Sequence, residues 1–288
     1  MGISLKIDLH MHTTVSDGTD TPEEIVARVR EAGINVFSVT DHDAVKACRI
    51  IPALVGEGLF YVTGAEFSTR DEAGKYHILG YGFDPDSAPI RELTETGHGN
   101  RMKKVRARLD FLKEEFGFVF PENEIEKLLA QDNPGKPHIG NLMVKYGYAE
   151  TKRKAIEEYI NRRHFASEYI RPEYAIERIL AGGGVPVLAH PTYGDGDQLI
   201  LGEEMEGRLK KLAGFGLQGV ECFYSGFSPR MTRDMLAFAE RFGFYVTAGS
   251  DYHGANKMVV LGDTGLDLAD ETPERLKSFL ERCGLRLS

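Results

Sequence analysis

Six of the nine histidines in the sequence lie near the ends of predicted strands, and each has an aspartate or glutamate nearby. In parallel α/β folds the carboxyl ends of the strands meet on one face, so we expect these residues to share one site. The nitrogen and oxygen donors that we assign to this site are His10, His12, Asp17, His42, Glu66, His77, His190, Asp251 and His253.

The spacing of these donors favours metal binding. On an extended segment His10 and His12 point to the same side, roughly 6.6 Å apart, which is close enough to hold one ion. Asp251 and His253 repeat this spacing. A single histidine at a strand end is more often solvated or caps a turn, but the joint occurrence of so many donors outweighs that alternative. A donor set without thiolate suits Zn²⁺, Mn²⁺ or Fe²⁺, and the sequence does not choose among them.

The elements that must position these residues alternate between strands and helices, which is typical of a mainly parallel sheet, open or closed into a barrel. Residues 60–69 and 76–83 flank a turn and predict a hairpin, which would bring His77 close to Glu66. Thr21 and Glu24 predict the capped start of a helix. Further strands are predicted at residues 5–10, 35–40, 185–189, 217–223 and 244–250.

The pattern changes between residues 84 and 170, where long stretches are typical of helices with no strand between them. This segment is predicted to be a helical insertion. One of its helices carries an apolar stripe, and Arg101 and Arg108 on the flank of that stripe could reach toward the metals if the stripe packs on the barrel. Lys103, Lys104 and Arg106 fit a solvated basic face better. The stripe consists of Met102, Val105, Leu109, Leu112 and Phe116.

The composition excludes several classes of protein. The 288 residues carry a formal charge of −9, which argues against general binding to long nucleic acids. No apolar run is long enough to span a bilayer or to form a signal peptide, so we expect a cytoplasmic protein that contacts no membrane. The cysteines Cys48, Cys222 and Cys283 are widely spaced and are expected to be buried thiols.

The motifs DLHMHTTVSDGTDTPEEIVARVREAGINVFSVTDHDAV, GAEF, LAHP and GSDYHG occur in the order typical of the PHP (polymerase and histidinol phosphatase) family, which the chain resembles. The resemblance implies a distorted (β/α)₇ TIM-like barrel of residues 1–83 and 171–288, with residues 84–170 as a helical insertion that covers the active site. It also implies two or three divalent metals. The first would be bound by His10, His12, Glu66 and Asp251, the second by Glu66, His77 and His190, and the third by Asp17, His42 and His253.

The insertion resembles that of stand-alone PHP phosphoesterases acting on nucleoside 3′,5′-bisphosphates and on 5′-terminal nucleotides of short RNA. The resemblance implies a small phosphorylated substrate contacted by the insertion. This chain has Lys136 where relatives commonly have Arg, and Phe227 where they often have His. Lys offers a point charge without the bidentate fork of Arg. His98 and His164 are expected to be surface histidines, and the expected substrate contacts are Asn100, Arg101, Lys136 and His138.

The expected chemistry is hydrolysis of a phosphomonoester by a metal-bridging hydroxide, without a Ser or Cys nucleophile. Asp41 would orient a ligating imidazole instead of binding metal. Three alternatives remain open: a histidinol-phosphate phosphatase, a non-catalytic PHP module, and an enzyme that hydrolyses C–N bonds. The cationic insertion and the complete set of ligand positions favour a nucleotide phosphoesterase. The sequence leaves open which phosphate is released and the oligomeric state.

Overall fold

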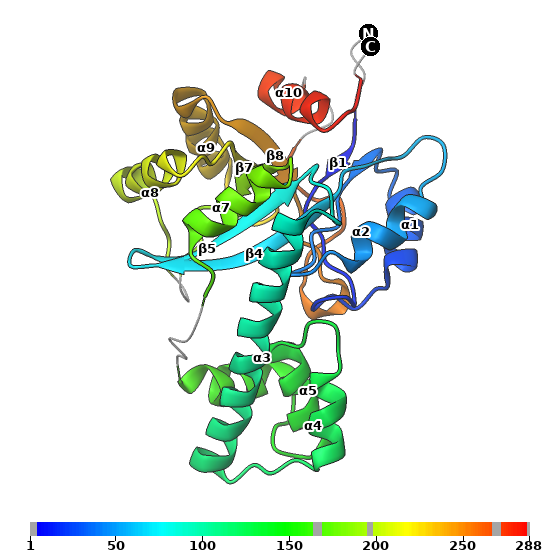
Figure 1. Cartoon of the computed structure of the whole chain (residues 1–288), viewed down its shortest axis with the longest axis vertical. Helices are drawn as coiled ribbons and strands as arrows, with labels where there is room; N and C mark the ends of the chain where they lie inside the picture. Colours follow the sequence, from blue (N-terminus) through cyan, green and yellow to red (C-terminus); the bar gives the residue numbers. More distant parts are fainter. Residues whose placement is uncertain (1–4, 164–168, 195–197, 267–271, 287–288) are drawn as a thin grey trace.

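The structure is a computed structural model that describes residues 5–163, 169–194, 198–266 and 272–286. It is a mixed α/β fold with two parts (Figure 1). The upper part in this view holds the strands and most of the shorter helices. The long helix α3 (Ala88–Phe116) leads from it to a lower, helical part.

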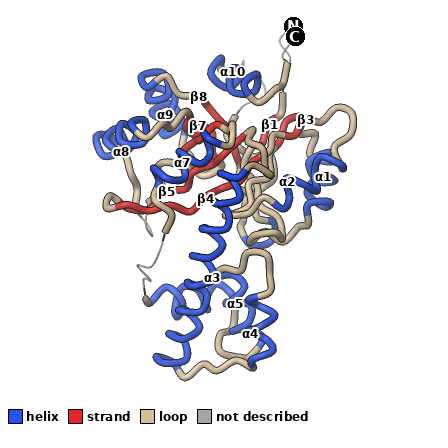
Figure 2. The backbone as a smooth tube through the Cα atoms, in the orientation of Figure 1, coloured by secondary structure: helices blue, strands red, loops and turns tan. Residues whose placement is uncertain are grey.

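The described strands form two sheets and not a closed barrel (Figure 2). Three short parallel strands, β1 (Ile7–Asp8), β2 (Val36–Phe37) and β3 (Phe60–Tyr61), form the first. The second has the order β4-β5-β6-β7-β8, in which β5 runs antiparallel to both neighbours. Its strands are β4 (Gly64–Asp71), β5 (Gly74–Tyr81), β6 (Val185–Leu188), β7 (Gly219–Tyr224) and β8 (Tyr245–Gly249). The hairpin prediction is confirmed, although its first strand is divided between β3 and β4.

Side chains supply some of the hydrogen bonds between the two sheets. The buried carboxylate of Asp8 accepts from the backbone amides of Ser250 at 2.9 Å and Gly262 at 2.8 Å. Among the described residues, the isolated bridges of Met11 with Tyr252 and His42 with Glu66 join the segments next to the two sheets, together with main-chain hydrogen bonds such as that from the Leu9 amide to the Ala248 carbonyl at 2.8 Å. These contacts do not extend into strand ladders that unite the two sheets, so the predicted closed barrel is not found.

The upper helices cover these sheets. The capping box of Thr21 and Glu24 opens α1 (Pro22–Glu31), as predicted. The short helix α2 (Lys46–Ile50) continues into a 3₁₀ turn (Ile51–Ala53). Among the others, α7, α9 and α10 pack on the five-stranded sheet. The bounds are α7 (Pro172–Ala181), α8 (Gly202–Gly214), α9 (Pro229–Phe242), α10 (Glu274–Arg282) and a 3₁₀ turn (Gly254–Asn256).

The lower part has its own hydrophobic cluster, separate from those under the sheets. Val105, Leu109 and Leu112 of the predicted stripe are buried in it. The stripe thus packs mainly against other helices instead of the strands. The division into domains at residues 84 and 170 stays a prediction. The remaining elements here are α4 (Glu122–Leu129), α5 (Lys136–Lys145), α6 (Lys152–Lys154), a π-helical turn (Ala155–Tyr159) and a 3₁₀ turn (Ile160–Arg162).

Two further expectations from the sequence concern membrane-spanning segments and the cysteines. Within the described residues no helix combines the length and apolar character needed to cross a bilayer. The thiols of Cys48 and Cys222 are free and buried, as predicted, whereas free Cys283 is half-buried.

Candidate metal centre

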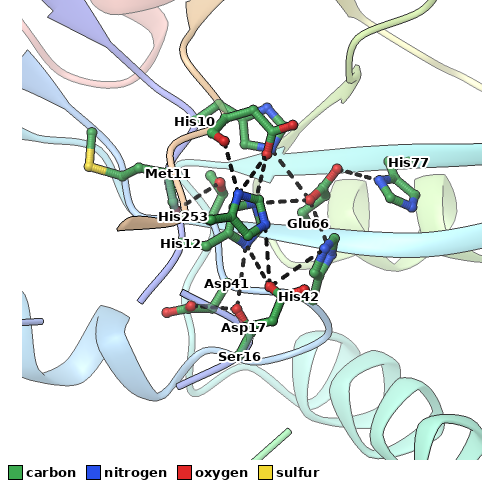
Figure 3. Close-up of polar contacts among 12 residues, drawn as sticks. His10, Met11, His12, Ser16, Asp17, Asp41, His42, Glu66, His77 and His253 are labelled. Carbon is green, nitrogen blue, oxygen red and sulfur yellow. Dashed lines mark hydrogen bonds and ion pairs between the residues drawn. The ribbon is translucent and has the colours of Figure 1, made fainter. Parts of the chain in front are cut away.

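The structure brings the nine predicted donors together at the strand ends, although they come from segments far apart in the sequence. His10 and His12 follow β1, His42 follows β2, and Asp251 and His253 follow β8. Glu66 lies in β4, His77 in β5, and His190 just after β6. Figure 3 shows imidazoles from several of these elements pointing toward Glu66 and Asp17. The expected convergence of strand ends on one face is therefore observed.

The carboxylate of Glu66 lies at the middle of the site. One oxygen, Oε1, is 2.6 Å from His77 Nδ1 and 3.1 Å from His190 Nε2. The other, Oε2, lies 3.1–3.3 Å from ring nitrogens of three more histidines, namely His10, His12 and His42. Glu66 therefore faces two groups of imidazoles, as a carboxylate that bridges two ions would.

Asp251 and Asp17 flank this carboxylate. Asp251 Oδ1 is 3.6 Å from His10 Nε2 and 3.4 Å from His12 Nε2. Asp17 Oδ1 is 3.4 Å from His253 Nε2 and 3.9 Å from His42 Nε2. The histidines thus lie between carboxylates, so alternating nitrogen and oxygen donors surround the centre.

Several of these atoms are buried without a hydrogen-bond partner in the described part of the chain, which is costly unless something else binds them. They belong to five histidine, aspartate and glutamate side chains and converge on the same volume. Three groups of residues could each hold an ion, because within a group the ligand atoms lie within 4.8 Å of one another. The groups are His12, Asp17, His42 and His253; His10, His12 and Glu66; and His42, Glu66 and His77. The unpartnered atoms include His10 Nε2, His12 Nε2, Asp17 Oδ1, His42 Nδ1 and Glu66 Oε2.

These groups fit divalent metal ions bound by nitrogen and oxygen. They differ from the expected sets in three respects. His42 joins Glu66 and His77 where the resemblance implied His190, Asp251 is not grouped with His10, His12 and Glu66, and His12 also joins the group of Asp17. His190 Nε2 nevertheless lies 3.2 Å from His77 Nδ1. The assignment of each residue to a particular ion stays a prediction.

The electrostatics of the centre keep its carboxylates ionised. Burial alone would raise the pKa of Glu66, but His77, His42 and His10 around it hold that pKa well below its usual value. The pKa values of Asp17 and Asp251 are likewise low, because neighbouring histidines outweigh burial. Burial also lowers the pKa of His77 to about 3, which leaves this imidazole neutral and able to bind metal.

A glutamate that sequence reasoning missed holds two of the histidines from behind. Glu221 in β7 is fully buried, and its Oε1 lies 3.0 Å from His10 Nδ1. Its Oε2 accepts from the backbone amide of His190 at 2.7 Å. A carboxylate behind a ligating imidazole fixes the ring's tautomer and orientation. The available signal was a lone acidic residue inside the apolar run LQGVECF.

Asp41 is predicted to orient an imidazole, and its position beside His42 suggests that ring. Its hydrogen-bond partners are different. Its carboxylate accepts from the Thr13 amide and hydroxyl and from the Ser16 hydroxyl. Ser16 Oγ in turn lies 3.4 Å from His12 Nδ1. Asp41 therefore supports the loop after His12 through Ser16.

Asp251 has two further partners that the sequence did not reveal. Its Oδ2 accepts from the Tyr224 hydroxyl at 3.0 Å and pairs with the ammonium of Lys257. Lys257 Nζ also lies 2.9 Å from the Tyr224 oxygen. These contacts leave Oδ1 of Asp251 facing His10 and His12.

The backbone is unusual at the same place. Asp43, His190 and Asp251 are the described non-glycine residues with positive φ. Such conformations cost about 1–3 kcal/mol each and cluster at functional sites. A side chain at Gly249 in β8 would place its Cβ 2.2 Å from His10 Cβ and 2.4 Å from Glu221 Oε1. Only glycine therefore leaves room for this histidine–glutamate pair.

A cavity of about 320 Å³ adjoins the centre, and we call it the cationic cavity. It shares Asp17, His42 and His77 with the donors described above. Its wall also carries basic side chains from α3, α5 and β5, which are Lys75, Arg101, Lys104, Arg108 and Lys136. A pocket with so many cations beside a metal centre suits an anionic group of a bound substrate.

Some but not all of the expected substrate contacts line this cavity. Asn100, Arg101 and Lys136 line it, whereas His138 does not. His138 Nδ1 instead accepts from the Gly135 amide at 3.0 Å and so caps α5. Arg101 Nη2 pairs with Asp43 Oδ2 at 2.8 Å. His98 is exposed, as predicted, and His164 lies outside the described residues.

Lys104 corrects the prediction of a solvated basic face. It is only 9% exposed, and its ammonium lies 3.2 Å from the centre of the Tyr169 ring. It turns inward with Arg101 and Arg108, while Lys103 and Arg106 are exposed. Burial, together with neighbouring cations, lowers the pKa of Lys104 to about 7 and that of Lys136 to about 8. An anion in the cavity would therefore relieve repulsion among these side chains.

Residues 8–213 match the PHP domain. The chain belongs to the PHP domain family. It is a metal-dependent phosphoesterase, since relatives with curated functions are named for phosphoester hydrolysis. A 5′-3′ exoribonuclease of Haemophilus influenzae is 29% identical over 92% of this chain and 96% of its own length. A 3′,5′-nucleoside bisphosphate phosphatase of Chromobacterium violaceum is 26% identical over 86% of this chain and 87% of its own.

Solved structures share the fold of this chain. A candidate metal-dependent phosphoesterase from Bifidobacterium adolescentis covers 100% of this chain and 99% of its own, with a TM-score of 0.83 and 25% identity. An amidohydrolase from Chromobacterium violaceum, solved with bound sulfate, covers 96% of each chain with a TM-score of 0.79 at 22% identity. The second likeness concerns the fold alone.

Proposed function

We propose that this PHP protein hydrolyses the 3′-phosphate ester of a nucleotide that also carries a 5′-phosphate. The substrates would be nucleoside 3′,5′-bisphosphates and the 5′-terminal nucleotide of short RNA. The observation that carries the proposal is the wall of Asp17, His42 and His77, which the metal centre shares with the cationic cavity. A substrate with two anionic groups could occupy both places at once.

The donors around Glu66 would hold two or three divalent ions, for which Zn²⁺, Mn²⁺ and Fe²⁺ are suited. Such ions lower the pKa of water and neutralise charge on phosphate oxygens. The protein's own contribution is to fix the donors. Glu221 orients His10, the Tyr224 hydroxyl holds Asp251, and Asp41 supports the loop after His12.

One direction of binding would bring the ester bond to be broken to the metal centre in both substrates. If the 5′-phosphate lies in the cationic cavity, the ester on the 3′ oxygen lies at the metal centre. Water supplies the oxygen that bonds to phosphorus, the P–O3′ bond breaks, and O3′ keeps the electron pair and takes up a proton. A bisphosphate then gives inorganic phosphate, and RNA gives a nucleoside 5′-monophosphate and a shorter chain with a 5′-phosphate.

Within the cavity, we assign the 5′-phosphate to the cations that α3 contributes to the wall, Arg101, Lys104 and Arg108. Arg101 contributes a guanidinium whose Nε is buried without a partner in the described residues. Arg108 Nε is in the same situation. Charge-assisted hydrogen bonds to phosphate oxygens would satisfy these donors.

The test is release of phosphate or nucleotide from a panel, with metal content measured on the same sample. The panel holds a nucleoside 3′,5′-bisphosphate, the matching 3′- and 5′-monophosphates, a short 5′-phosphorylated RNA and histidinol phosphate. We expect the highest kcat/KM for the compounds with both a 5′-phosphate and a 3′-phosphate ester. Selective hydrolysis of histidinol phosphate, or equal rates on the 3′-monophosphate and the bisphosphate, would contradict the proposal.

A further inference from the structure

A second cavity, of about 410 Å³, lies beyond the metal centre and is lined differently from the cationic cavity. Tyr193, Tyr224, Met258, Val260 and Lys257 form most of its wall, and we call it the aromatic groove. The apolar side chains on its rim are unusually exposed, since Val260 is 71% and Met258 fully exposed. Such exposed apolar side chains beside a polar site indicate a surface that another molecule covers.

The rings of the aromatic groove are held in fixed positions. Tyr193 lies 5.7 Å from Tyr224 and 6.2 Å from Phe227, measured between ring centres, and is stacked on Phe227. The Tyr193 hydroxyl donates to the carbonyl of Gly226 at 2.7 Å. The ring nevertheless remains 37% exposed. It is thus a packed, oriented aromatic surface with an open side, which is what a stacked nucleobase requires.

The groove is continuous with the metal centre. A cavity of about 370 Å³ between them is lined by Glu66, His190 and Asp251 on one side and by Tyr193, Tyr224 and Lys257 on the other. The cationic cavity adjoins the same centre through Asp17, His42 and His77. The order across the protein is therefore cationic cavity, metal centre, aromatic groove.

We infer that the aromatic groove binds the second nucleotide of an RNA chain, with its base stacked on Tyr193. The inference rests on the proposed function, which places the first nucleotide's 5′-phosphate in the cationic cavity and the ester between the two nucleotides at the metal centre. The second nucleotide must then leave the centre on the side away from the cationic cavity. Apart from Lys257, that side carries mainly aromatic and apolar surface, which suits a base better than another phosphate.

The groove also gives a role to Phe227, the position at which this chain departs from many relatives. Phe227 packs against both Tyr193 and Tyr224, with 5.2 Å between its ring centre and that of Tyr224. Phe227 therefore helps to hold the exposed ring of Tyr193 in place. We assign Phe227 as a positioning residue for the stacking surface.

The experiment compares three substrates on the metal-loaded full chain: a nucleoside 3′,5′-bisphosphate, a 5′-phosphorylated dinucleotide, and the same dinucleotide with no base on its second sugar. Tyr193→Ala should lower kcat/KM for the dinucleotide, relative to the bisphosphate, by about 5- to 150-fold, the range expected for loss of one base stack. Tyr193→Phe keeps the ring and should restore most of the preference. The wild-type protein should prefer the dinucleotide with its base to the one without.

Met258→Ala serves as a second variant, because a fully exposed side chain can be shortened without affecting folding. It should shift the same ratio in the same direction by a smaller factor. Equal losses on all three substrates, or an unchanged ratio in Tyr193→Ala, would overturn the inference. Hydrolysis of the bisphosphate by the wild type tests the proposed function separately. If no substrate is hydrolysed, equilibrium titration decides, since equal affinity for the two dinucleotides would also overturn the inference.

Discussion

The metal centre and the cationic cavity share a wall but are built in different ways. The centre uses histidine, aspartate and glutamate side chains at strand ends, which are buried or half-buried, and some are fixed by a partner such as Glu221. The cavity uses long lysine and arginine side chains, mainly from α3 and α5. Short donors on a rigid backbone fix geometry, whereas long cations supply charge with some freedom of position. Substitutions in the two places should therefore have different consequences.

The largest expected effect is that of Glu66→Gln. The substitution removes the central negative charge and a ligand from two of the three donor groups, so we expect metal content to fall and kcat to drop by well over about 100-fold, more than is usual for an orienting residue. Metal analysis and turnover of the bisphosphate on the same sample check this. Glu221→Gln is the matched control, with an expected loss of about 10- to 100-fold. A metal-replete, fully active Glu66→Gln protein would contradict our view of the centre.

Arg101→Ala and Lys104→Met should reduce activity while leaving metal content unchanged. Loss of one charge-assisted contact to the 5′-phosphate should lower kcat/KM for the bisphosphate by roughly 10- to 150-fold, and the effect on the 3′-monophosphate should be much smaller. Arg106→Ala on the exposed side of the same helix is the control. If the 3′-monophosphate loses as much activity as the bisphosphate, the cavity does not bind the second phosphate.

The third prediction concerns pH. Because Lys104 and Lys136 have pKa values lowered to about 7 and about 8, both lose charge as the pH rises through that range. The phosphate stays doubly charged there, so kcat/KM for the bisphosphate should fall with rising pH, by up to about tenfold between pH 6.5 and 9, relative to the 3′-monophosphate. Lys104→Met should flatten this relative profile. A ratio that does not change with pH would show that these amines do not contact substrate.

The smallest expected effect concerns the contact between α3 and Asp43. A Cβ at Gly97 of α3 would lie 2.8 Å from Asp43 Cβ, whereas one at Gly99 meets nothing within 4 Å. Gly97→Ala should therefore displace Asp43 and its ion pair with Arg101, and destabilise the protein by about 1–3 kcal/mol. Gly99→Ala should be neutral or stabilise α3 by up to about 1 kcal/mol. Urea unfolding of the metal-loaded proteins measures both, and equal stabilities would show that α3 can shift freely.

The sequence was sufficient for the donors because strand ends, hairpin pairing and the i, i+2 spacing depend on local pattern. It was insufficient where partners are set by tertiary packing. Nothing local reveals that Glu221 lies behind His10, that Lys257 pairs with Asp251, or that Lys104 turns inward. The closed barrel was overestimated because the contacts between the two sheets stay short: isolated bridges, a few main-chain hydrogen bonds and side chains such as Asp8. His138 was a plausible substrate contact, but its ring nitrogen caps a helix.

The positive φ angles of His190 and Asp251 limit how this site could be transferred to another protein. Aspartate and histidine tolerate that backbone better than most residues. At each of these two positions the residue therefore suits both the backbone conformation and the expected metal. A designer who grafts the nine side chains onto regular strands or helices would reproduce their identities but not the directions of these two. Any recipient scaffold must therefore supply two left-handed turns at the ends of its strands.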